Sequence, residues 1–230
     1  MRVWVARPEP GAGRTGAALA GLGHAPLVAP VLAVRPTGAL PPEGPFDGLV
    51  LTSANAVPAV AGIARGLPVF AVGARTAAAA ARAGLRPVIE GPGDGTGLAA
   101  RIRETMPPGA RLLHAAGAER KPEPAASLAR AGFAVIAFVA YRAEPLPALP
   151  AAAGAALAAG ALDAALHYSR RSAATALDLA EAAGHGGAFR ALRHYCLSGD
   201  VARALEAAAV PVHFVAARPH ETDLLGGLVR

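Results

Sequence analysis

The sequence repeats itself at about half its length, and this repeat limits the folds that the chain can adopt. The segment at 7–32 reads RPEPGAGRTGAALAGLGHAPLVAPVL, and the segment at 120–142 reads RKPEPAASLARAGFAVIAFVAYR. Each contains a Pro-Glu-Pro turn, a helix ending in glycine and a β-branched strand. Two more pairs follow in the same order, 49–57 with 165–173 and 69–85 with 194–210. A period this long indicates a duplicated domain, not a solenoid, so we expect two similar lobes with a cleft between them.

Short apolar runs alternate with helix-like stretches along the chain, which predicts an α/β fold with parallel sheets covered by helices on both faces. Strands are expected at 2–6, 26–33, 48–52, 69–72, 86–89, 111–114, 134–140, 164–168, 193–197 and 211–215. Helices are expected at 14–21, 75–83, 97–105, 123–131, 172–183, 201–208 and 221–229. A chain of 230 residues is long enough for two domains of roughly 100 residues each.

Composition indicates a globular protein with an anionic partner. Hydrophobic residues make up 53% of the chain and charged residues 17%, and the formal net charge is +6. The arginines are scattered and aromatic residues make up only 4%, whereas nucleic-acid binding favours a basic stripe with aromatic stacking platforms. A polyanionic small molecule therefore fits better than nucleic acid.

The sequence predicts a cytoplasmic protein. The apolar run in MRVWVARPEP is too short for a signal-peptide core. The most apolar stretch, 148–162, is interrupted by Pro150 and is shorter than the roughly 20 residues that a membrane span needs. The single cysteine, Cys196, permits no internal disulfide and fits a reducing compartment.

Small polar residues follow four of the expected strands. The first half places Thr52, Ser53, Asn55, Gly73 and Thr76 at strand ends, and the second half places Ser169, Arg170, Ser172, Ser198 and Gly199 there. Each group alone suits a helix cap, because a side-chain oxygen there accepts from free backbone N–H groups. In doubly wound sheets, however, ligands bind beyond the carboxyl ends of strands. Hydroxyls and helix N-termini are also good anion receptors, so the repeated set favours an anion-binding site.

Three other motifs fit a functional site less well. GAGRTG at 11–16 matches the dinucleotide fingerprint, but four residues separate it from the preceding strand and the next strand ends at Arg35, not at a carboxylate. The seven histidines show no metal-ligand spacing; His167 and His194 lie on expected strands. Cys196 lies inside a strand and lacks the setting of a nucleophile.

The ordered motifs resemble the uroporphyrinogen-III synthase family over nearly the whole chain. They are the strand followed by Arg7-Pro8, the strand followed by TSANAV, the strand followed by GARTA, the strand ending at Tyr141, and the strand end at Tyr168-Ser169. The resemblance implies two flavodoxin-like lobes that exchange their first strands and are joined by two crossover segments, 26–35 and 134–143. One lobe would hold residues 1–34 with 144–230, and the other 35–143.

The resemblance also implies the chemistry. The substrate would be hydroxymethylbilane, a linear tetrapyrrole with eight carboxylates, and no cofactor or metal would be needed. Loss of its terminal hydroxyl gives an azafulvene that cyclises unaided to the wrong isomer, so the enzyme must direct attack to the substituted carbon of ring D through a spiro intermediate. We expect a monomer that binds neither nucleic acid nor membrane.

Tyr141 matches the family's tyrosine at the crossover and is the candidate proton donor to the departing hydroxyl. The alternative is an aromatic residue that only fills a lobe junction. The candidate substrate-binding residues are Arg7, Thr52, Ser53, Asn55, Gly73, Thr76, Ser169, Arg170, Ser198 and Gly199; Arg14 and Arg142 are further candidate carboxylate partners.

The sequence departs from the family at one position. Where the second lobe of the family has Gly-x-x-Thr-Ala, this chain reads Ser198-Gly199-Asp200-Val201-Ala202. Either a hydroxyl at position 201 is dispensable, or Ser198 replaces it. Two rival functions stay open at this point: a bilobal binding or sensor protein without catalysis, and a nucleotide-dependent enzyme that uses GAGRTG.

Overall fold

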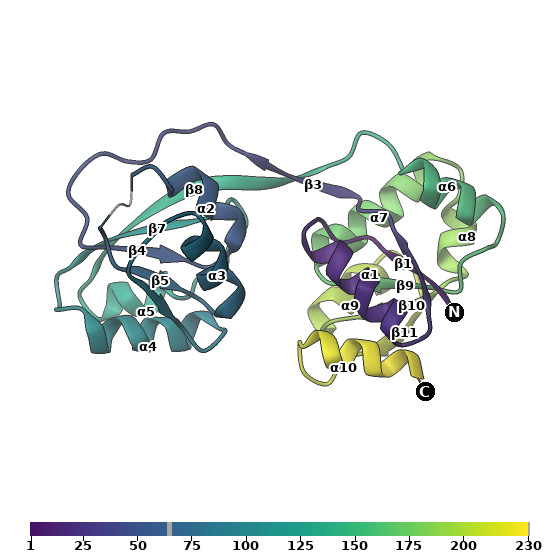
Figure 1. The fold of residues 1–230 in the computed structure, drawn as a ribbon. Helices are drawn as coiled ribbons and strands as arrows, with labels where there is room; N and C mark the ends of the chain where they lie inside the picture. Colours follow the sequence, from purple (N-terminus) through teal and green to yellow (C-terminus); the bar gives the residue numbers. More distant parts are fainter. Residues whose placement is uncertain (64–65, 230) are drawn as a thin grey trace. The chain divides into compact units, whose positions relative to one another are not determined.

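The chain forms two compact units in a computed structural model that describes residues 1–63 and 66–229. The first unit comprises Met1–Ala33 with Glu144–Arg230, and the second unit comprises Val34–Ala143. Figure 1 shows that both chain termini belong to the first unit. Each unit is an α/β structure with its own sheet, so the expected fold class is confirmed.

The first unit is built on a five-stranded sheet with the order β11-β10-β9-β1-β2. Its strands are β1 (Arg2–Val5), β2 (Ala25–Val28), β9 (Ala164–His167), β10 (Arg193–Cys196) and β11 (Val212–Val215). Its helices are α1 (Gly11–Gly21), α6 (Ala151–Ala158), α7 (Arg170–Ala182), α8 (Gly186–Arg190), α9 (Gly199–Glu206), α10 (Glu221–Gly226) and the 3-10 helix η2 (Gly227–Val229). The neighbouring strands of this sheet pair in parallel.

The second unit is built on a six-stranded sheet with the order β3-β8-β7-β4-β5-β6. Its strands are β3 (Leu32–Pro36), β4 (Gly48–Leu51), β5 (Val69–Ala71), β6 (Val88–Glu90), β7 (Arg111–Gly117) and β8 (Ala134–Pro145). Its helices are the 3-10 helix η1 (Ala54–Ala56), α2 (Val57–Val60), α3 (Ala74–Arg82), α4 (Gly95–Thr105) and α5 (Ala125–Arg130). The strands from β8 through β6 pair in parallel.

The two sheets share one strand order. The order β11-β10-β9-β1-β2 in the first unit corresponds to β6-β5-β4-β7-β8 in the second, so β9 matches β4, β10 matches β5 and β1 matches β7. The Pro-Glu-Pro turns match in detail as well. The Glu9 carboxylate accepts the Gly13 N–H over 3.0 Å, and the Glu123 carboxylate accepts the Ser127 N–H over 3.2 Å. The sequence repeat therefore corresponds to a repeat of structure.

The cores form because alternate residues of each strand point to opposite faces. In the second unit, Leu49 and Leu51 pack in one buried cluster with residues of η1 and α2, whereas Val50 packs in another with residues of α4. Both faces are covered, which explains why the central strands read as unbroken apolar runs. In the first unit, Trp4 is fully buried and donates through Nε1 to the Ala29 carbonyl over 2.8 Å.

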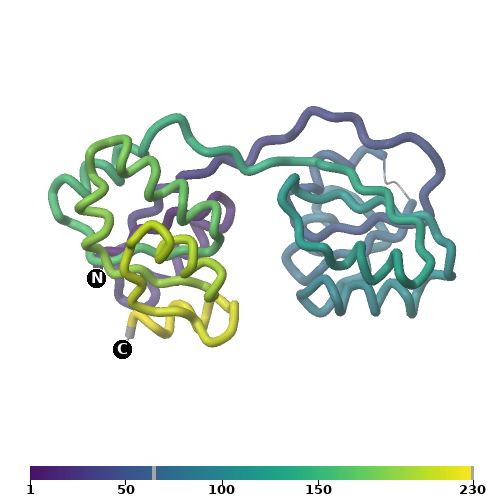
Figure 2. The backbone as a smooth tube through the Cα atoms, turned by 180° about the vertical axis from the view of Figure 1, so that it is seen from behind, coloured from purple at the N-terminus to yellow at the C-terminus, as the bar shows by residue number. Residues whose placement is uncertain are grey.

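The chain passes between the units twice, at 33–34 and at 143–144. Figure 2 shows the two passing segments side by side, and they run antiparallel, since Leu146 N donates to Val31 O and Thr37 N donates to Ala140 O. The strand expected at 26–33 is wrong as one element, because it divides into β2, which pairs with β1, and β3, which pairs with β8. Pro30 lies at the break and has no N–H to donate to a ladder. The exchange of first strands stays a prediction.

Candidate functional site

In the second unit, Thr52 and Ser53 follow β4 directly. Ser53 has an extended backbone, with φ −154° and ψ 141°, and its side chain caps η1 by accepting the Asn55 N–H over 3.2 Å. The capping interpretation is therefore correct for Ser53, but the bond uses only an oxygen lone pair. No bond among the described residues uses the hydroxyl hydrogen, so it is able to donate a second bond.

Thr52 is held by a buried histidine on the neighbouring strand. Its Oγ1 lies 3.3 Å from Nε2 of His114, a β7 residue with 1% exposure. Burial, and then the positive charge of Arg120, lower the pKa of His114 to about 4. The imidazole is therefore neutral at pH 7 and orients the Thr52 hydroxyl without bringing a charge. No local pattern in the sequence marks this contact, which joins positions 62 residues apart.

Gly73 and Thr76 begin α3, after β5. Gly73 is its N-cap, with φ −174° and ψ 178°, and Thr76 N donates back to Gly73 O over 3.0 Å. The Thr76 side chain is only 2% exposed. It lies in the interior of the second unit, and its role as a substrate contact stays a prediction.

The first unit repeats this arrangement with Ser169 and Ser198. Ser169 caps α7 by accepting the Ser172 N–H over 3.1 Å, whereas the Ser198 side chain makes no capping bond to α9. β9 and β10 pair directly, as do β4 and β5. All four caps therefore lie at the carboxyl ends of neighbouring parallel strands, which is the edge where such sheets bind ligands.

The remaining strand-end residues of the first unit are Arg170, Gly199 and Val201. Arg170 is exposed and lies 3.7 Å from the Asp200 carboxylate. Gly199 is the first residue of α9, and Val201, in the same turn, is 4% exposed. Val201 occupies the position that Thr76 has in α3, and both side chains are buried. A buried position explains why the hydroxyl can be replaced by a methyl group there.

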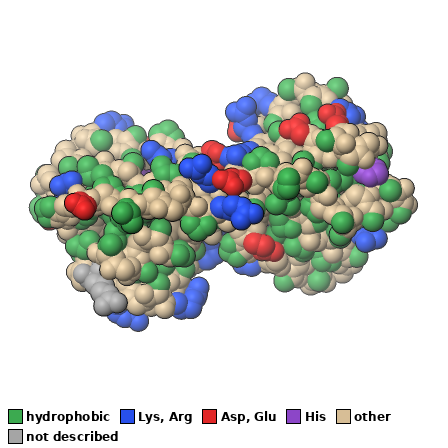
Figure 3. All heavy atoms as spheres, turned by 90° about the horizontal axis from the view of Figure 1, so that it is seen from above, with side chains coloured by type: hydrophobic (Ala, Val, Ile, Leu, Met, Phe, Trp, Pro, Cys, Tyr) green, Lys and Arg blue, Asp and Glu red, His purple; other side chains and the backbone are tan. Residues whose placement is uncertain are grey.

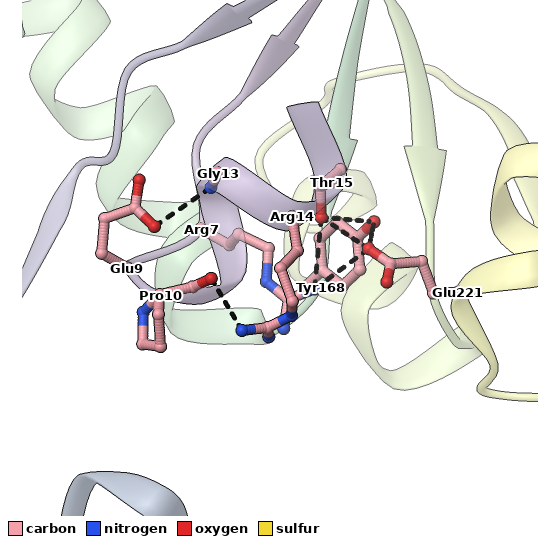
Figure 4. Close-up of polar contacts among 8 residues, drawn as sticks. All are labelled: Arg7, Glu9, Pro10, Gly13, Arg14, Thr15, Tyr168 and Glu221. Carbon is pink, nitrogen blue, oxygen red and sulfur yellow. Dashed lines mark hydrogen bonds and ion pairs between the residues drawn. The ribbon is translucent and has the colours of Figure 1, made fainter. Parts of the chain in front are cut away.

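Arg7, which follows β1, forms a network with three other side chains, Thr15, Tyr168 and Glu221 (Figure 4). One carboxylate oxygen, Oε1 of Glu221, lies 2.5 Å from Thr15 Oγ1, 2.6 Å from the Tyr168 hydroxyl and 3.3 Å from Arg7 Nη1. The Arg7 guanidinium lies 3.9 Å from the centre of the Tyr168 ring. Sequence reasoning named Arg7 but missed Thr15 and Glu221. In the sequence, only the position of Thr15 is indicated locally: it lies on the same buried face of α1 as Leu19.

The number of hydroxyl hydrogens in this network determines which of its contacts are hydrogen bonds. Thr15 and Tyr168 have one hydroxyl hydrogen each, and both hydroxyls form their shortest contacts with the carboxylate. The 3.3 Å contact between the two hydroxyls is therefore left without a hydrogen. Burial, then the bond to Glu221, raise the pKa of Tyr168 well above its ordinary range. Tyr168 is thus a neutral donor that is already engaged.

Glu221 remains ionised in this setting. Burial is the largest influence and by itself raises its pKa, but the hydrogen bonds from Thr15 and Tyr168 and the charge of Arg7 outweigh it. The resulting pKa of Glu221 lies below its ordinary value, because each of these partners favours the charged form.

Tyr141 has a different environment from Tyr168. It lies on β8 opposite Gly117 of β7, where the register of the two strands shifts. A Cβ at position 117 would lie 2.9 Å from two carbons of the Tyr141 ring and 3.1 Å from its hydroxyl, so the ring rests on the glycine backbone. Among the described residues, no hydrogen bond engages the Tyr141 hydroxyl.

The start of α1 shows what the GAGRTG motif does in the fold. The N–H groups of Gly11 and Ala12 both donate to Pro8 O over 3.2 Å, and Gly13 N donates to the Glu9 carboxylate. The N–H groups that would bind a phosphate in a dinucleotide site already have acceptors, and one acceptor is negatively charged. This arrangement argues against a nucleotide site.

Two of the buried histidines, His167 and His194, and the cysteine are part of the core of the first unit. His194 donates through Nε2 to the Phe189 carbonyl, so its Nδ1 accepts from Nε2 of His167 over 2.9 Å. Burial raises the pKa of Cys196 to about 12, which keeps the thiol protonated and unreactive. Within residues 1–63 and 66–229, no three His, Cys, Asp or Glu side chains gather closely enough to hold a metal ion.

The fold and these edges together define a class: proteins of two α/β units, each of which presents hydroxyls and helix N-termini at the carboxyl ends of neighbouring parallel strands. The family model described as uroporphyrinogen-III synthase HemD matches residues 13–226. The chain therefore belongs to the uroporphyrinogen-III synthase family.

Solved structures with the same fold carry related names. The uroporphyrinogen-III synthetase of Helicobacter pylori is 15% identical, with 99% of this chain and 97% of that chain covered and a TM-score of 0.63. A mutant uroporphyrinogen III synthase of the extremely thermophilic bacterium Thermus thermophilus is 22% identical, with 100% and 96% covered and a TM-score of 0.50. No curated protein matches the sequence. At these identities the likeness establishes a shared fold.

Proposed function

We propose that the protein is a uroporphyrinogen-III synthase, a cyclising lyase of tetrapyrrole (haem) biosynthesis. Membership of the family over residues 13–226 supports this activity. One observation on this chain's own residues also supports the activity. Hydrogen-bond donors recur at the strand ends of both units, at Ser53 and Gly73 in one and at Ser169 and Ser198 in the other. The substrate, hydroxymethylbilane, has eight carboxylates, and such donors suit carboxylates.

Substrate binding is assigned to both lobes, residues 1–34 with 144–230 and residues 35–143, whose bounds differ from those of the two units by one residue, Val34. The residues assigned to binding are Arg7, Thr52, Ser53, Asn55, Gly73, Thr76, Ser169, Arg170, Ser198 and Gly199. The free hydroxyl hydrogen of Ser53 and the Ser198 hydroxyl, which makes no capping bond, are suited to donate to carboxylate oxygens. Selectivity then comes from the orientation in which the chain of pyrroles is held.

Tyr141 is assigned as the proton donor. The terminal hydroxyl of hydroxymethylbilane leaves as water with the proton of Tyr141, and the pyrrole left behind becomes an electrophilic azafulvene. The substituted carbon of ring D attacks it to give a spiro intermediate, which rearranges and returns a ring proton to the Tyr141 oxygen, so the net change is the loss of one water. Tyr141 suits this role better than Tyr168, because the Tyr168 hydrogen is committed to Glu221.

We assign the protein to the cytoplasm and expect it to be a monomer. We also expect it to bind neither nucleic acid nor membrane. A single buried cysteine fits a reducing compartment. No helix among the described residues has the length and apolar character to cross a membrane. On the face shown in Figure 3, Lys and Arg lie in separate groups interspersed with Asp and Glu, unlike the continuous basic stripe of nucleic-acid binders.

The test is the isomer produced from freshly generated hydroxymethylbilane without added cofactor. The product is oxidised, and type I and type III uroporphyrin are separated. We expect predominantly type III. Type I alone, formed at the uncatalysed rate by protein shown to be folded, would instead support a bilobal binding or sensor protein.

A further inference from the structure

The guanidinium of Arg7 is fixed by two neighbours that leave it little freedom. The Tyr168 ring lies 3.9 Å from Cζ. Gly11 lies so close that a Cβ there would be 2.6 Å from Nε, 2.8 Å from Cζ and 2.9 Å from Nη2. These nearly equal distances place the missing Cβ over the guanidinium plane. Arg7 can therefore adopt this position only because residue 11 has no side chain.

The described hydrogen bonds of Arg7 all use one of its nitrogens. Nη1 lies 3.3 Å from Glu221 Oε1 and 3.5 Å from Thr15 Oγ1. Nε and Nη2 form the other edge of the planar group, and this edge is the fork that binds a carboxylate through two parallel bonds. The Arg7 side chain keeps 22% exposure, so the immobilised side chain is still partly open to solvent.

Glu221 sets the direction in which that fork points. Its Oε1 is held by the Thr15 and Tyr168 hydroxyls and in turn holds Nη1, as Figure 4 shows. An ionised partner on one edge of a guanidinium neutralises part of its charge, yet it leaves the geometry of the opposite edge intact. Arg14, whose charge also favours the ionised form of Glu221, keeps the surroundings positive.

We propose that Arg7 receives one carboxylate of the ligand through Nε and Nη2, and that Gly11, Tyr168 and Glu221 are positioning residues for this fork. The identity of the ligand rests on the proposed function. The fork itself indicates an oxyanion, since a planar pair of N–H donors matches two oxygens of a carboxylate or a phosphate, and the proposed function makes that oxyanion a carboxylate.

The main test compares Gly11→Ala with Gly13→Ala. Both lie in the first turn of α1, but a Cβ at position 13 meets its nearest atom at 3.5 Å, an ordinary contact. Binding is measured with uroporphyrin III, the oxidised octacarboxylate product, by fluorescence titration, and KM and kcat are measured with hydroxymethylbilane. We expect Gly11→Ala to weaken probe binding and raise KM by roughly tenfold, the size of a lost charge-assisted hydrogen bond. Its kcat and melting temperature should stay close to wild type, and Gly13→Ala should resemble wild type throughout.

Arg7→Lys supplies a second test that does not depend on helix packing. It keeps the charge and loses the fork, so it should weaken probe binding nearly as much as Arg7→Gln. Binding restored by lysine would show a simple point charge and overturn the proposal, as would unchanged binding in Gly11→Ala. Because probe binding needs no turnover, these outcomes stay separate from the isomer assay, which alone decides the proposed function.

Discussion

The Tyr168 hydroxyl donates to the Glu221 carboxylate over 2.6 Å, although the two residues are 53 positions apart. Tyr168 follows β9 and Glu221 begins α10, so the bond ties α10 to the carboxyl end of β9 in the first unit. A tyrosine hydroxyl bonded to an ionised carboxylate is among the stronger hydrogen bonds in proteins.

Tyr168→Phe should lower the free energy of unfolding by about 1–3 kcal/mol at pH 7, because it removes a hydrogen bond to a charged group. Chemical denaturation measures this, with Tyr195→Phe as the control, since the described hydroxyl bonds of the unit do not involve Tyr195. The deficit should shrink as the pH falls through the lowered pKa of Glu221, because the protonated carboxyl no longer favours the bond. An equal loss in both variants would show that the bond contributes nothing specific.

Tyr141→Phe should lower kcat by about a hundredfold with little change in KM, the usual cost of losing a positioned general acid. Steady-state rates with hydroxymethylbilane measure this. A variant that retains the full rate would remove Tyr141 from the mechanism and leave it as a residue that fills space.

Gly117→Ala should also slow turnover, because its Cβ would lie 2.9 Å from the Tyr141 ring and displace it. Gly187→Ala is the matched control, since nothing lies within 4 Å of the Cβ that it adds. We expect the ratio of type III to type I product to fall only in Gly117→Ala. A wild-type ratio there would mean that the position of the ring is not important.

The stability of the protein should decrease on acidification below about pH 6.5. Burial lowers the pKa of His167 to about 3 and those of His114 and His194 to about 4. Between these values and the ordinary pKa, the unfolded chain binds more protons, so the free energy of unfolding rises with pH by up to about 1.4 kcal/mol per unit for each histidine. Urea unfolding from about pH 4.5 to about pH 7.5, the range in which these three histidines titrate in the unfolded chain but not in the folded one, measures the slope. His114→Gln should reduce it in the second unit, and a flat profile would contradict the expectation.

Val201→Thr, which restores the residue typical of the family, should destabilise the protein by about 1 kcal/mol without improving the isomer ratio, because a buried hydroxyl without a partner is unfavourable. The Val201 side chain is 4% exposed.

The mirror substitution, Thr76→Val, tests whether the first copy of this position binds substrate: a raised KM would support contact, and an unchanged KM would remove Thr76 from the site. Thermal unfolding, the isomer assay and steady-state rates together provide these measurements.

The sequence by itself determined the local elements and the duplication, because both depend on short-range patterns. Apolar runs of about four to eight residues are typical of buried parallel strands, and most of the expected strands are present at nearly their expected bounds. The caps at Ser53 and Ser169 could be predicted for the same reason, since a cap bonds within three residues of itself. The break of 26–33 into β2 and β3 could not be predicted from the sequence, because each half pairs with a strand from a different part of the chain.

Only the tertiary structure decided which side chains act together. Arg7 and Glu221 are 214 positions apart, and nothing near Glu221 marks it as the partner of an arginine at the first strand. Likewise, only the tertiary structure places the Arg7 guanidinium against Gly11, whereas in the sequence this glycine is part of a poor match to the dinucleotide fingerprint. The physical reason is that strand and helix periods are set by neighbouring residues, but the bonds at a sheet edge depend on the strand order, which brings distant parts of the chain together.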